Sequence, residues 1–282
     1  PTPGRTQQAN RVIFLSAVER WPGTPHAAPL FLLTASGGDA VLQVPALRWS
    51  LPEAPRSSQF GGFVSSAQRF DHATFNVSPA EARAMDPQQR LLLEAGYEAT
   101  HGASLRRKQL VDCNMGVFVA IMNTDFSGLG DRESVYAATG TQISIASGRL
   151  AFVLGLQGPC ASVDTACSAA LVALDGAVHS LQAGACGEAL PAAVNLMLQP
   201  QMSLLFASAG MLSMDGRCKT FDARSNGYVR GEGVGSAVLD VAEGNQSLVV
   251  GGCSVRADGK SASLTAPNGT AQARLIGAAR AL

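Results

Sequence analysis

The run from Val163 to Leu171, VDTACSAAL, joins a short apolar strand pattern to a helical pattern through a sharp turn. This arrangement places Cys167 in the first turn of the predicted helix. Unpaired backbone N–H groups and the positive end of the helix dipole favour a thiolate over a thiol at that position. The same N–H groups can stabilise an oxyanion when the thiolate attacks a thioester or another acyl carbonyl. The run therefore predicts a nucleophilic cysteine on a strand, turn and helix.

The helix that follows Cys167 has apolar residues on every face. They recur at helical spacing and then fill the remaining positions: Leu171, Leu174, Val178 and Leu181, with Val172, Ala173 and Ala177. Such a pattern predicts a helix that is buried on all sides. A lone cysteine in an apolar run is more often an inert core residue than a nucleophile, so the rest of the chain must decide.

Composition bounds the class of protein. A chain of 282 residues with 46% hydrophobic and 15% charged residues can bury a large core, in one large or two small domains. Basic and acidic residues balance at 21 each, without the basic block that nucleic-acid binding requires, so no nucleic-acid partner is expected. No apolar run reaches the length of a membrane span, and the first residues lack a secretory signal. Six scattered cysteines without a CxxC pair indicate reduced thiols and no metal site, so we expect a soluble, intracellular protein of the cytoplasm.

Strand and helix patterns alternate along the chain. Strands are predicted at Val12–Val18, Leu30–Thr34, Val111–Met122, Cys160–Val163, Ala189–Leu198, Ser236–Val241 and Leu248–Val255. Two helices are predicted after the caps Ser78 (with Glu81) and Asp86 (with Gln89), and the second of them ends near Gly102. Further helices are predicted at Ile143–Leu156, after Cys167 and at the end of the chain. This alternation is typical of an α/β layered fold with a mainly parallel sheet.

Four longer motifs occur in order: QLVDCNMGVFVAIMNTDF, YAATGTQISIASGRLAFVLGLQGP, VDTACSAAL and DGRCKTFDARSNGYVRGEGVG. Together they resemble the ketosynthase (β-ketoacyl synthase) domains of type I polyketide synthases and fatty acid synthases. The resemblance covers residues 60–282, and AMDPQQRLLLE favours the polyketide relatives. In residues 1–59 it rests on VPALRWS and WPG alone.

This resemblance implies the thiolase fold, two similar halves in five α/β/α/β/α layers. Residues 1–59 are then a divergent N-terminal region, residues 60–241 the N-terminal half, and residues 248–282 the start of a truncated C-terminal half. The chain opens without an initiating Met and stops inside a helical pattern, so we expect a fragment.

The resemblance also implies a reaction. An acyl group moves from the phosphopantetheine of an acyl carrier protein to the cysteine that matches Cys167. Malonyl-carrier protein then loses carbon dioxide, and its enolate attacks the acyl thioester in a Claisen condensation. The chain itself binds no cofactor in this scheme. Its expected partners are the carrier protein, malonyl and acyl thioesters, and a second copy of the chain in a homodimer.

Two histidines of the family's second half assist that condensation, and neither has a match here. The four histidines present are His26, His72, His101 and His179. His179 shares a helix with Cys167 but lies roughly 18 Å away along the axis. The sequence therefore predicts acyl transfer to Cys167 and leaves condensation by this chain open. The alternatives are a degenerate domain that binds acyl groups or carrier protein, or dimerises, and a thiolase or acyltransferase relative acting on coenzyme A thioesters.

Other candidate site residues come from the same resemblance. Phe206 matches an aromatic that borders the acyl pocket beside the cysteine; ordinary core packing is its alternative. Tyr136–Ser147 matches a region at the dimer interface that lines the partner's pocket. Within it, Thr139, Gly140 and Gln142 are pocket or interface candidates that otherwise simply begin a helix.

The glycine-rich segment Phe221–Gly235 does not fit a nucleotide-binding loop. It lacks the Lys-Ser/Thr pair of a P-loop and does not lead from a strand into a helix. We expect its glycines to allow close backbone turns, with Arg230 and Glu232 available for internal pairing. Asp164 and Thr165, just before the cysteine, are expected to satisfy backbone groups at the turn.

Overall fold

The computed structural model describes residues 11–24, 30–122, 125–130, 133–242, 248–263 and 266–281. A five-stranded sheet forms its centre, in the order β1 (Arg11–Arg20), β7 (Gly233–Ala242), β6 (Glu188–Asn195), β4 (Met115–Ile121) and β5 (Cys160–Val163). Strand β4 is parallel to both β5 and β6, whereas β7 is antiparallel to β6 and β1. The α/β class is confirmed: β1, β6, β4 and β5 run in one direction, as expected of a mainly parallel sheet, and β7 alone runs against them, which makes the sheet mixed. The connection from β6 to β7 does not cross the sheet, so β7 starts beside the residue at which β6 ends.

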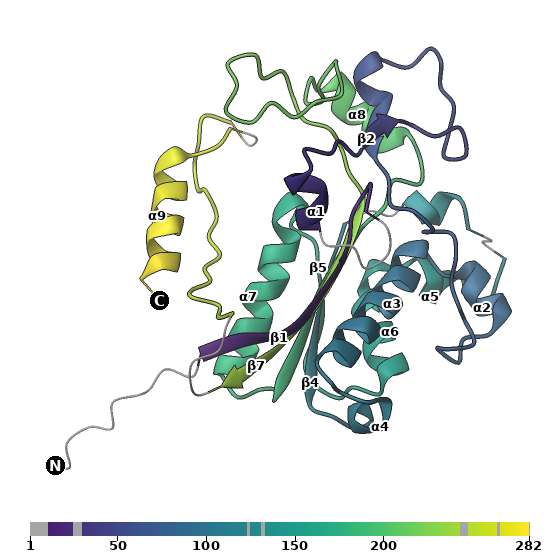
Figure 1. Ribbon diagram of the computed structural model, residues 1–282, viewed down its shortest axis with the longest axis vertical. Helices are drawn as coiled ribbons and strands as arrows, with labels where there is room; N and C mark the ends of the chain where they lie inside the picture. Colours follow the sequence, from purple (N-terminus) through teal and green to yellow (C-terminus); the bar gives the residue numbers. More distant parts are fainter. Residues whose placement is uncertain are drawn as a thin grey trace.

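Helices cover both faces of this sheet. Figure 1 shows the sheet nearly edge-on, with α7 (Ala169–Gln182) on one side and α3 (Pro87–Gly102) and α6 (Ile143–Leu154) on the other. Strand β4 is buried along its whole length, and its side chains contribute to two hydrophobic cores, one on each face of the sheet. Val117, Val119 and Ile121 pack towards α3 and α6, while Phe118 and Ala120 pack towards α7. The alternation of side chains along a strand thus builds three layers.

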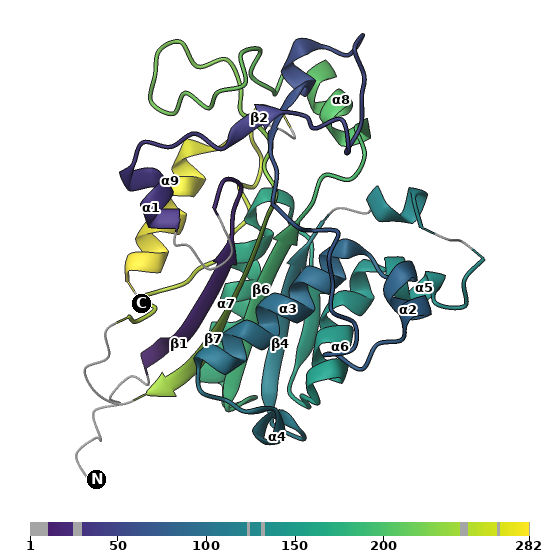
Figure 2. The same ribbon diagram turned by 45° about the vertical axis from the view of Figure 1, so that its right-hand side comes forward.

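Shorter elements complete the described fold: α1 (Leu30–Ala35), β2 (Val41–Gln43), η1 (Arg56–Ser58), β3 (Phe60–Gly62), α2 (Pro79–Ala84), α4 (Arg107–Leu110), η2 (Asp125–Gly128), α5 (Ala137–Thr141), η3 (Ala166–Ser168), α8 (Gln201–Ser208) and α9 (Gly269–Arg280). Strands β2 and β3 form a separate antiparallel pair. Figure 2 shows this pair beyond the end of the main sheet, near α8.

The predicted caps start α2 and α3. The Ser78 hydroxyl accepts a hydrogen bond from the Glu81 backbone N–H at 3.1 Å. Asp86 accepts from the backbone N–H of Gln88 at 2.8 Å, so the partner is Gln88 and not the predicted Gln89. A proline at the first turn of each helix fixes the backbone angle and loses no hydrogen bond.

Two predicted strands are absent from the described residues. Leu30–Thr34 lies in α1 instead, because a short leucine-rich run suits a helix as well as a strand. Leu248–Val255 follows β1 without becoming a strand. Its backbone makes two hydrogen bonds there, Phe14 N to Leu248 O and Val250 N to Val12 O, at 3.2 and 2.8 Å.

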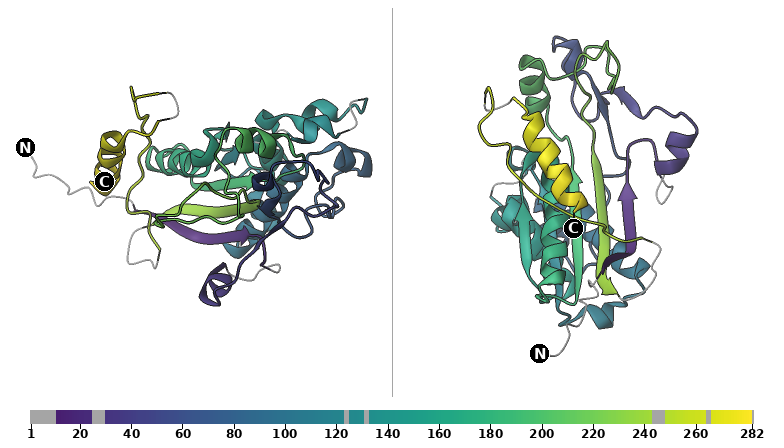
Figure 3. Two further views of the ribbon diagram at one scale, coloured as in Figure 1. Left: turned by 90° about the horizontal axis from the view of Figure 1, so that it is seen from above. Right: turned by 90° about the vertical axis from the view of Figure 1, so that its left-hand side faces the viewer.

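Helix α7 is buried on one face only, so the prediction of a helix buried on all sides is wrong. Ala169, Ala173, Ala177 and Leu181 pack against the sheet, whereas Leu171 is 67% exposed. Helix α9, the last helix of the chain in both views of Figure 3, buries none of its described residues. Among the described residues, no helix is both long and apolar enough to cross a membrane.

Several connections meet at one edge of the sheet. The carboxyl ends of β4, β5 and β6 lie there, followed by η2, η3 and α8, and β7 begins at the same edge (Figure 1). In open α/β sheets this edge is where functional side chains from different loops come together.

Candidate functional site

Cys167 lies at this edge of the sheet, between β5 and α7. It belongs to the short turn η3, and α7 starts at Ala169. The thiol therefore precedes the first turn of the α-helix and does not lie within it as predicted. Its side chain is exposed, as an incoming substrate requires.

The turn before Cys167 is strained and held by its neighbours. Ala166 has a φ of 54°, in the left-handed region that costs a residue with a Cβ about 1–2 kcal/mol. The Asp164 carboxylate accepts from the Ala166 N–H at 2.9 Å. The Ser168 hydroxyl lies 2.9 Å from both the carbonyl and the hydroxyl oxygen of Thr165. The Asp164 contact confirms the backbone-satisfying role expected of that residue.

Tyr228 is a neighbour of Cys167 that sequence reasoning did not identify. Its backbone N–H donates to Met211 O at 3.0 Å, which holds the residue beside the end of α8. Burial raises the pKa of the Tyr228 phenol; Arg230 opposes this shift, and negative charge on Cys167 adds to it. A thiolate at Cys167 therefore makes the Tyr228 phenol harder to ionise.

Arg230 and Glu232 lie between Tyr228 and the start of β7, and both are buried. The Arg230 guanidinium lies over the ring of Phe206, 5.4 Å from its centroid. Glu232 pairs with Arg48 at 3.0 Å rather than with Arg230. The expected internal pairing is thus confirmed for Glu232, with a partner from VPALRWS, the motif that carried the resemblance in the N-terminal region.

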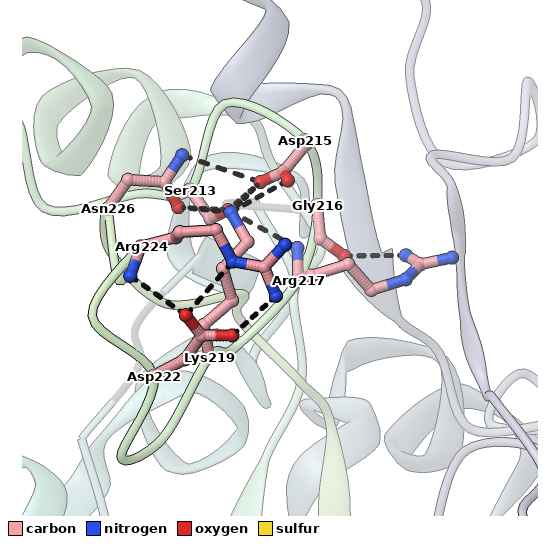
Figure 4. A network of polar contacts seen from close by, with 8 residues as sticks. All are labelled: Ser213, Asp215, Gly216, Arg217, Lys219, Asp222, Arg224 and Asn226. Carbon is pink, nitrogen blue, oxygen red and sulfur yellow. Dashed lines mark hydrogen bonds and ion pairs between the residues drawn. The ribbon is translucent and has the colours of Figure 1, made fainter.

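The loop between α8 and β7 folds on its own polar contacts (Figure 4). The Lys219 ammonium donates to Asp215 and Asn226 at 2.9 Å each, and Ser213 donates to Asp215 at 2.6 Å. The Lys219 and Ser213 hydrogen bonds hold the pKa of Asp215 well below its usual range. Gly227, with a φ of 121°, lets the chain return against Leu212, where a Cβ would lie 2.6 Å from the backbone. These contacts are internal, which fits the structural role expected of this loop.

Thr139, Gly140 and Gln142 lie at the junction of α5 and α6. The Thr139 and Gln142 carbonyls both accept hydrogen bonds from Gln89, at 3.3 and 3.4 Å. Gly140 packs so closely on α2 that a Cβ would lie 2.1 Å from Ala84 O. Their described contacts are with α2, α3 and α6, whereas Phe206 lies on α8 against Arg230, after β6. The pocket or interface role of the three residues remains a prediction.

The described histidines have local contacts. His72 Nδ1 lies 2.8 Å from Val77 O, His101 contacts Arg106, and His179 lies 3.3 Å from Asp175 on the same helix. His26 lies outside the described residues. The part of the chain that the structure describes contains no group of three or more His, Cys, Asp or Glu residues that could hold a metal ion.

Comparison with known proteins identifies the family. The pattern described as "Beta-ketoacyl synthase, N-terminal domain" matches residues 12–244, so the chain belongs to the β-ketoacyl synthase family. The chain is 41% identical, over 97% of its length, to the spectinabilin polyketide synthase system protein NorA' of Streptomyces orinoci, of which it covers 8%.

Solved structures show the same relationship. The ketosynthase from module 6 of the bacillaene synthase of Bacillus subtilis 168 superposes with a TM-score of 0.84 at 30% identity, over 94% of this chain and 47% of that one. The oxazolomycin ketosynthase domain OzmH KS7 of Streptomyces albus JA3453 gives 0.86 at 28% identity, over 95% and 50%. The chain thus has the thiolase-like fold of polyketide ketosynthases and spans about half the length of these solved chains.

Proposed function

We propose that Cys167 takes acyl groups from the phosphopantetheine thioester of an acyl carrier protein. The observation that carries this proposal is the exposed Cys167 thiol on a strained turn at the carboxyl edge of the sheet. The thiolate attacks the thioester carbonyl, a new carbon–sulfur bond forms, and the phosphopantetheine thiolate leaves. Phe206 forms a wall of the pocket that receives the acyl chain.

The second step is a decarboxylative condensation in a protein that carries both halves of the domain. Malonyl-carrier protein releases carbon dioxide, and the enolate carbon attacks the acyl carbonyl on Cys167. The carbon–sulfur bond to Cys167 breaks, the 3-ketoacyl chain stays on the carrier, and the Cys167 thiolate is regenerated. Membership of the ketosynthase family and the thiolase-like fold support this reaction. In this scheme residues 60–241 are the half that carries the nucleophile, and residues 248–282 begin the other half.

We also propose that the domain forms a homodimer through β5. This strand ends the main sheet, and among the described residues only β4 pairs with it. An open strand edge can continue its sheet in a second copy. Beside it, Phe152 on α6 is 85% exposed and lines a surface groove with Thr139 and Ile145. Sedimentation velocity should give a dimer at micromolar concentration, and a monomer there would contradict the proposal.

Transfer from two donors tests the main proposal. The protein is incubated with an acyl group on carrier protein or on coenzyme A, and acyl adducts are quantified by intact mass. Faster loading from carrier protein is expected, and loading from coenzyme A alone would favour a thiolase or acyltransferase relative. Malonyl-carrier protein is then added: a 3-ketoacyl product supports condensation, and stable acyl-protein without product supports the non-condensing alternative.

The six cysteines are all free thiols, which supports a reducing compartment, the cytoplasm, as the place of action.

A further inference from the structure

Arg230 makes two contacts with one helix. Its Cζ lies 5.4 Å from the centroid of the Phe206 ring, within the range of a cation–π interaction. Its Nη1 donates to the Ser203 hydroxyl at 2.8 Å, and both residues are buried, at 7% and 5% exposure. Ser203 and Phe206 are three residues apart on α8, so they lie on the same face of the helix. The guanidinium therefore holds this face of α8 at two points.

The charge of Arg230 has no carboxylate of its own within ion-pair distance in the described residues. The nearby Glu232 is already occupied: its Oε2 accepts from Arg48 and from Val64 N, and its Oε1 accepts from Met197 N, at 3.0, 2.9 and 2.9 Å. Burial lowers the pKa of Arg230, and the more distant charges of Asp125, Tyr228 and Glu232 oppose that shift. A buried guanidinium is costly unless its surroundings compensate it. The Phe206 ring face and the Ser203 hydroxyl are the direct contacts that do so here.

The position of Arg230 also connects it to the nucleophile. It lies two residues after Tyr228, whose phenol interacts electrostatically with both Arg230 and Cys167. The ring that Arg230 contacts lies on α8, which follows β6 at the end of the sheet where Cys167 follows β5. Without the guanidinium the Phe206 ring would still pack, but its orientation would no longer be set by a charge and a hydrogen bond.

We propose that Arg230 is a positioning residue that fixes the Phe206 ring through the Arg230–Phe206 and Arg230–Ser203 contacts and thereby sets which acyl chain lengths reach Cys167. This inference rests on the proposed acyl transfer to Cys167 and on Phe206 as a wall of the acyl pocket. Arg230 itself does not contact the reacting atoms in this account. Its effect is on selectivity between acyl groups, transmitted through the ring.

A double-mutant cycle on the full protein tests the proposal. Loading rates of a short and a long acyl group, each carried on the phosphopantetheine of an acyl carrier protein, are measured by intact mass for wild type, Arg230→Met, Phe206→Leu and the double variant. Arg230→Met should change the ratio of the two rates by roughly three- to tenfold, the range of a partly buried cation–π contact. The same change made in the Phe206→Leu background should have no further effect on the ratio. Arg224→Met, in the same loop but with its side chain 84% exposed, is the matched control with an unchanged ratio.

The outcomes separate this inference from the function beneath it. If Phe206→Leu shifts the ratio but Arg230→Met does not, or if the two shifts add, Arg230 does not act through Phe206 and the inference is overturned. If Phe206→Leu leaves the ratio unchanged while Cys167 is still acylated, the pocket assignment of Phe206 fails as well. Absence of any Cys167 adduct in wild type overturns the proposed function itself. If Arg230→Met does not fold, Ser203→Ala and Arg230→Lys replace it, with a ratio change expected for the first and partial retention of the wild-type ratio for the second.

Discussion

Arg48 and Glu232 form an ion pair between a partly buried guanidinium and a buried carboxylate, with Nη2 of the guanidinium 3.0 Å from Oε2 of the carboxylate. Arg48 lies between β2 and β3, and Glu232 lies directly before β7, so the pair joins the N-terminal region to the edge that carries Cys167. The Glu232 side chain is fully buried and also accepts hydrogen bonds from two backbone N–H groups. Burial raises the pKa of this carboxyl, and Arg48 opposes the shift.

Removing one partner of this pair should destabilise the fold. Arg48→Met leaves a buried carboxylate without its counter-charge, and we expect the free energy of unfolding to fall by about 3–5 kcal/mol. The double variant Arg48→Met with Glu232→Gln should recover much of that loss. The control is Arg217→Met, which breaks an exposed ion pair with Asp39 and should cost less than about 1 kcal/mol. Urea unfolding measures all three, and equal losses for the buried and exposed pairs would contradict the account.

Gly140 and Gly148 provide a second matched comparison, because both lie in helices but only Gly140 is crowded. A Cβ at Gly140 would meet Ala84 O at 2.1 Å, whereas a Cβ at Gly148 has no neighbour within 4 Å. Gly140→Ala should lower the free energy of unfolding by about 1–3 kcal/mol or more, because backbone must move. Gly148→Ala should raise it by about 0.5–1 kcal/mol. A neutral result for Gly140→Ala in thermal unfolding would show that α5 does not pack on α2 as described.

Asp86 predicts a pH dependence of stability. Its side chain caps α3 and is buried, and desolvation raises its pKa from 3.8 to about 6. The folded state therefore holds this proton more tightly than the unfolded chain. The stability that the proton contributes is complete below about pH 4 and is lost as the pH rises to about 6. Asp86→Asn keeps an acceptor for the helix cap but cannot ionise.

As the pH rises from 4 to 7, wild type should thus lose on the order of 2–3 kcal/mol of unfolding free energy relative to Asp86→Asn. Urea unfolding at several pH values gives this difference. A difference that stays constant over the range would contradict the raised pKa.

Cys253 tests how the segment after β7 lies on α7. Burial, and then the nearby Asp175 carboxylate, raise the pKa of the Cys253 thiol to about 11. Because the thiolate is the reactive form, iodoacetamide at pH 8 should modify Cys253 about a hundredfold more slowly than an unperturbed thiol. Asp175→Asn should speed this reaction, while the exposed Cys160 should react at an unchanged rate in both proteins. Rapid modification of Cys253 in wild type would show that the segment does not lie against α7.

Local patterns predicted most individual elements. The apolar run Cys160–Val163 matches β5 along its whole length, and the Ser78 and Asp86 caps start α2 and α3 where the sequence places them. The turn that presents Cys167 also follows from its own residues, since Asp164 supports the backbone beside it. These features depend on neighbours in the chain, so a single sequence contains the signal.

Contacts between distant parts of the chain could not be read in the same way. Arg48 and Glu232 are 184 positions apart, and no periodicity connects them. The neighbourhood of Tyr228 and Cys167 depends on how the loop after α8 returns, and the antiparallel direction of β7 depends on the same loop. The exposed Leu171 shows a further limit of sequence-based prediction. An apolar residue on a helix does not by itself reveal whether another element packs against that face.

The most direct test of the account is the site of acylation. The purified protein, its Cys167→Ala variant and its Cys160→Ala variant are each incubated with an acyl-carrier protein, and the mass of the intact chain is measured. The account predicts one acyl adduct on wild type and on Cys160→Ala, and none on Cys167→Ala. Cys160 is a suitable control because its thiol is also exposed and lies only a few residues before the turn. An adduct of equal yield on Cys167→Ala would contradict the assignment of Cys167 as the nucleophile.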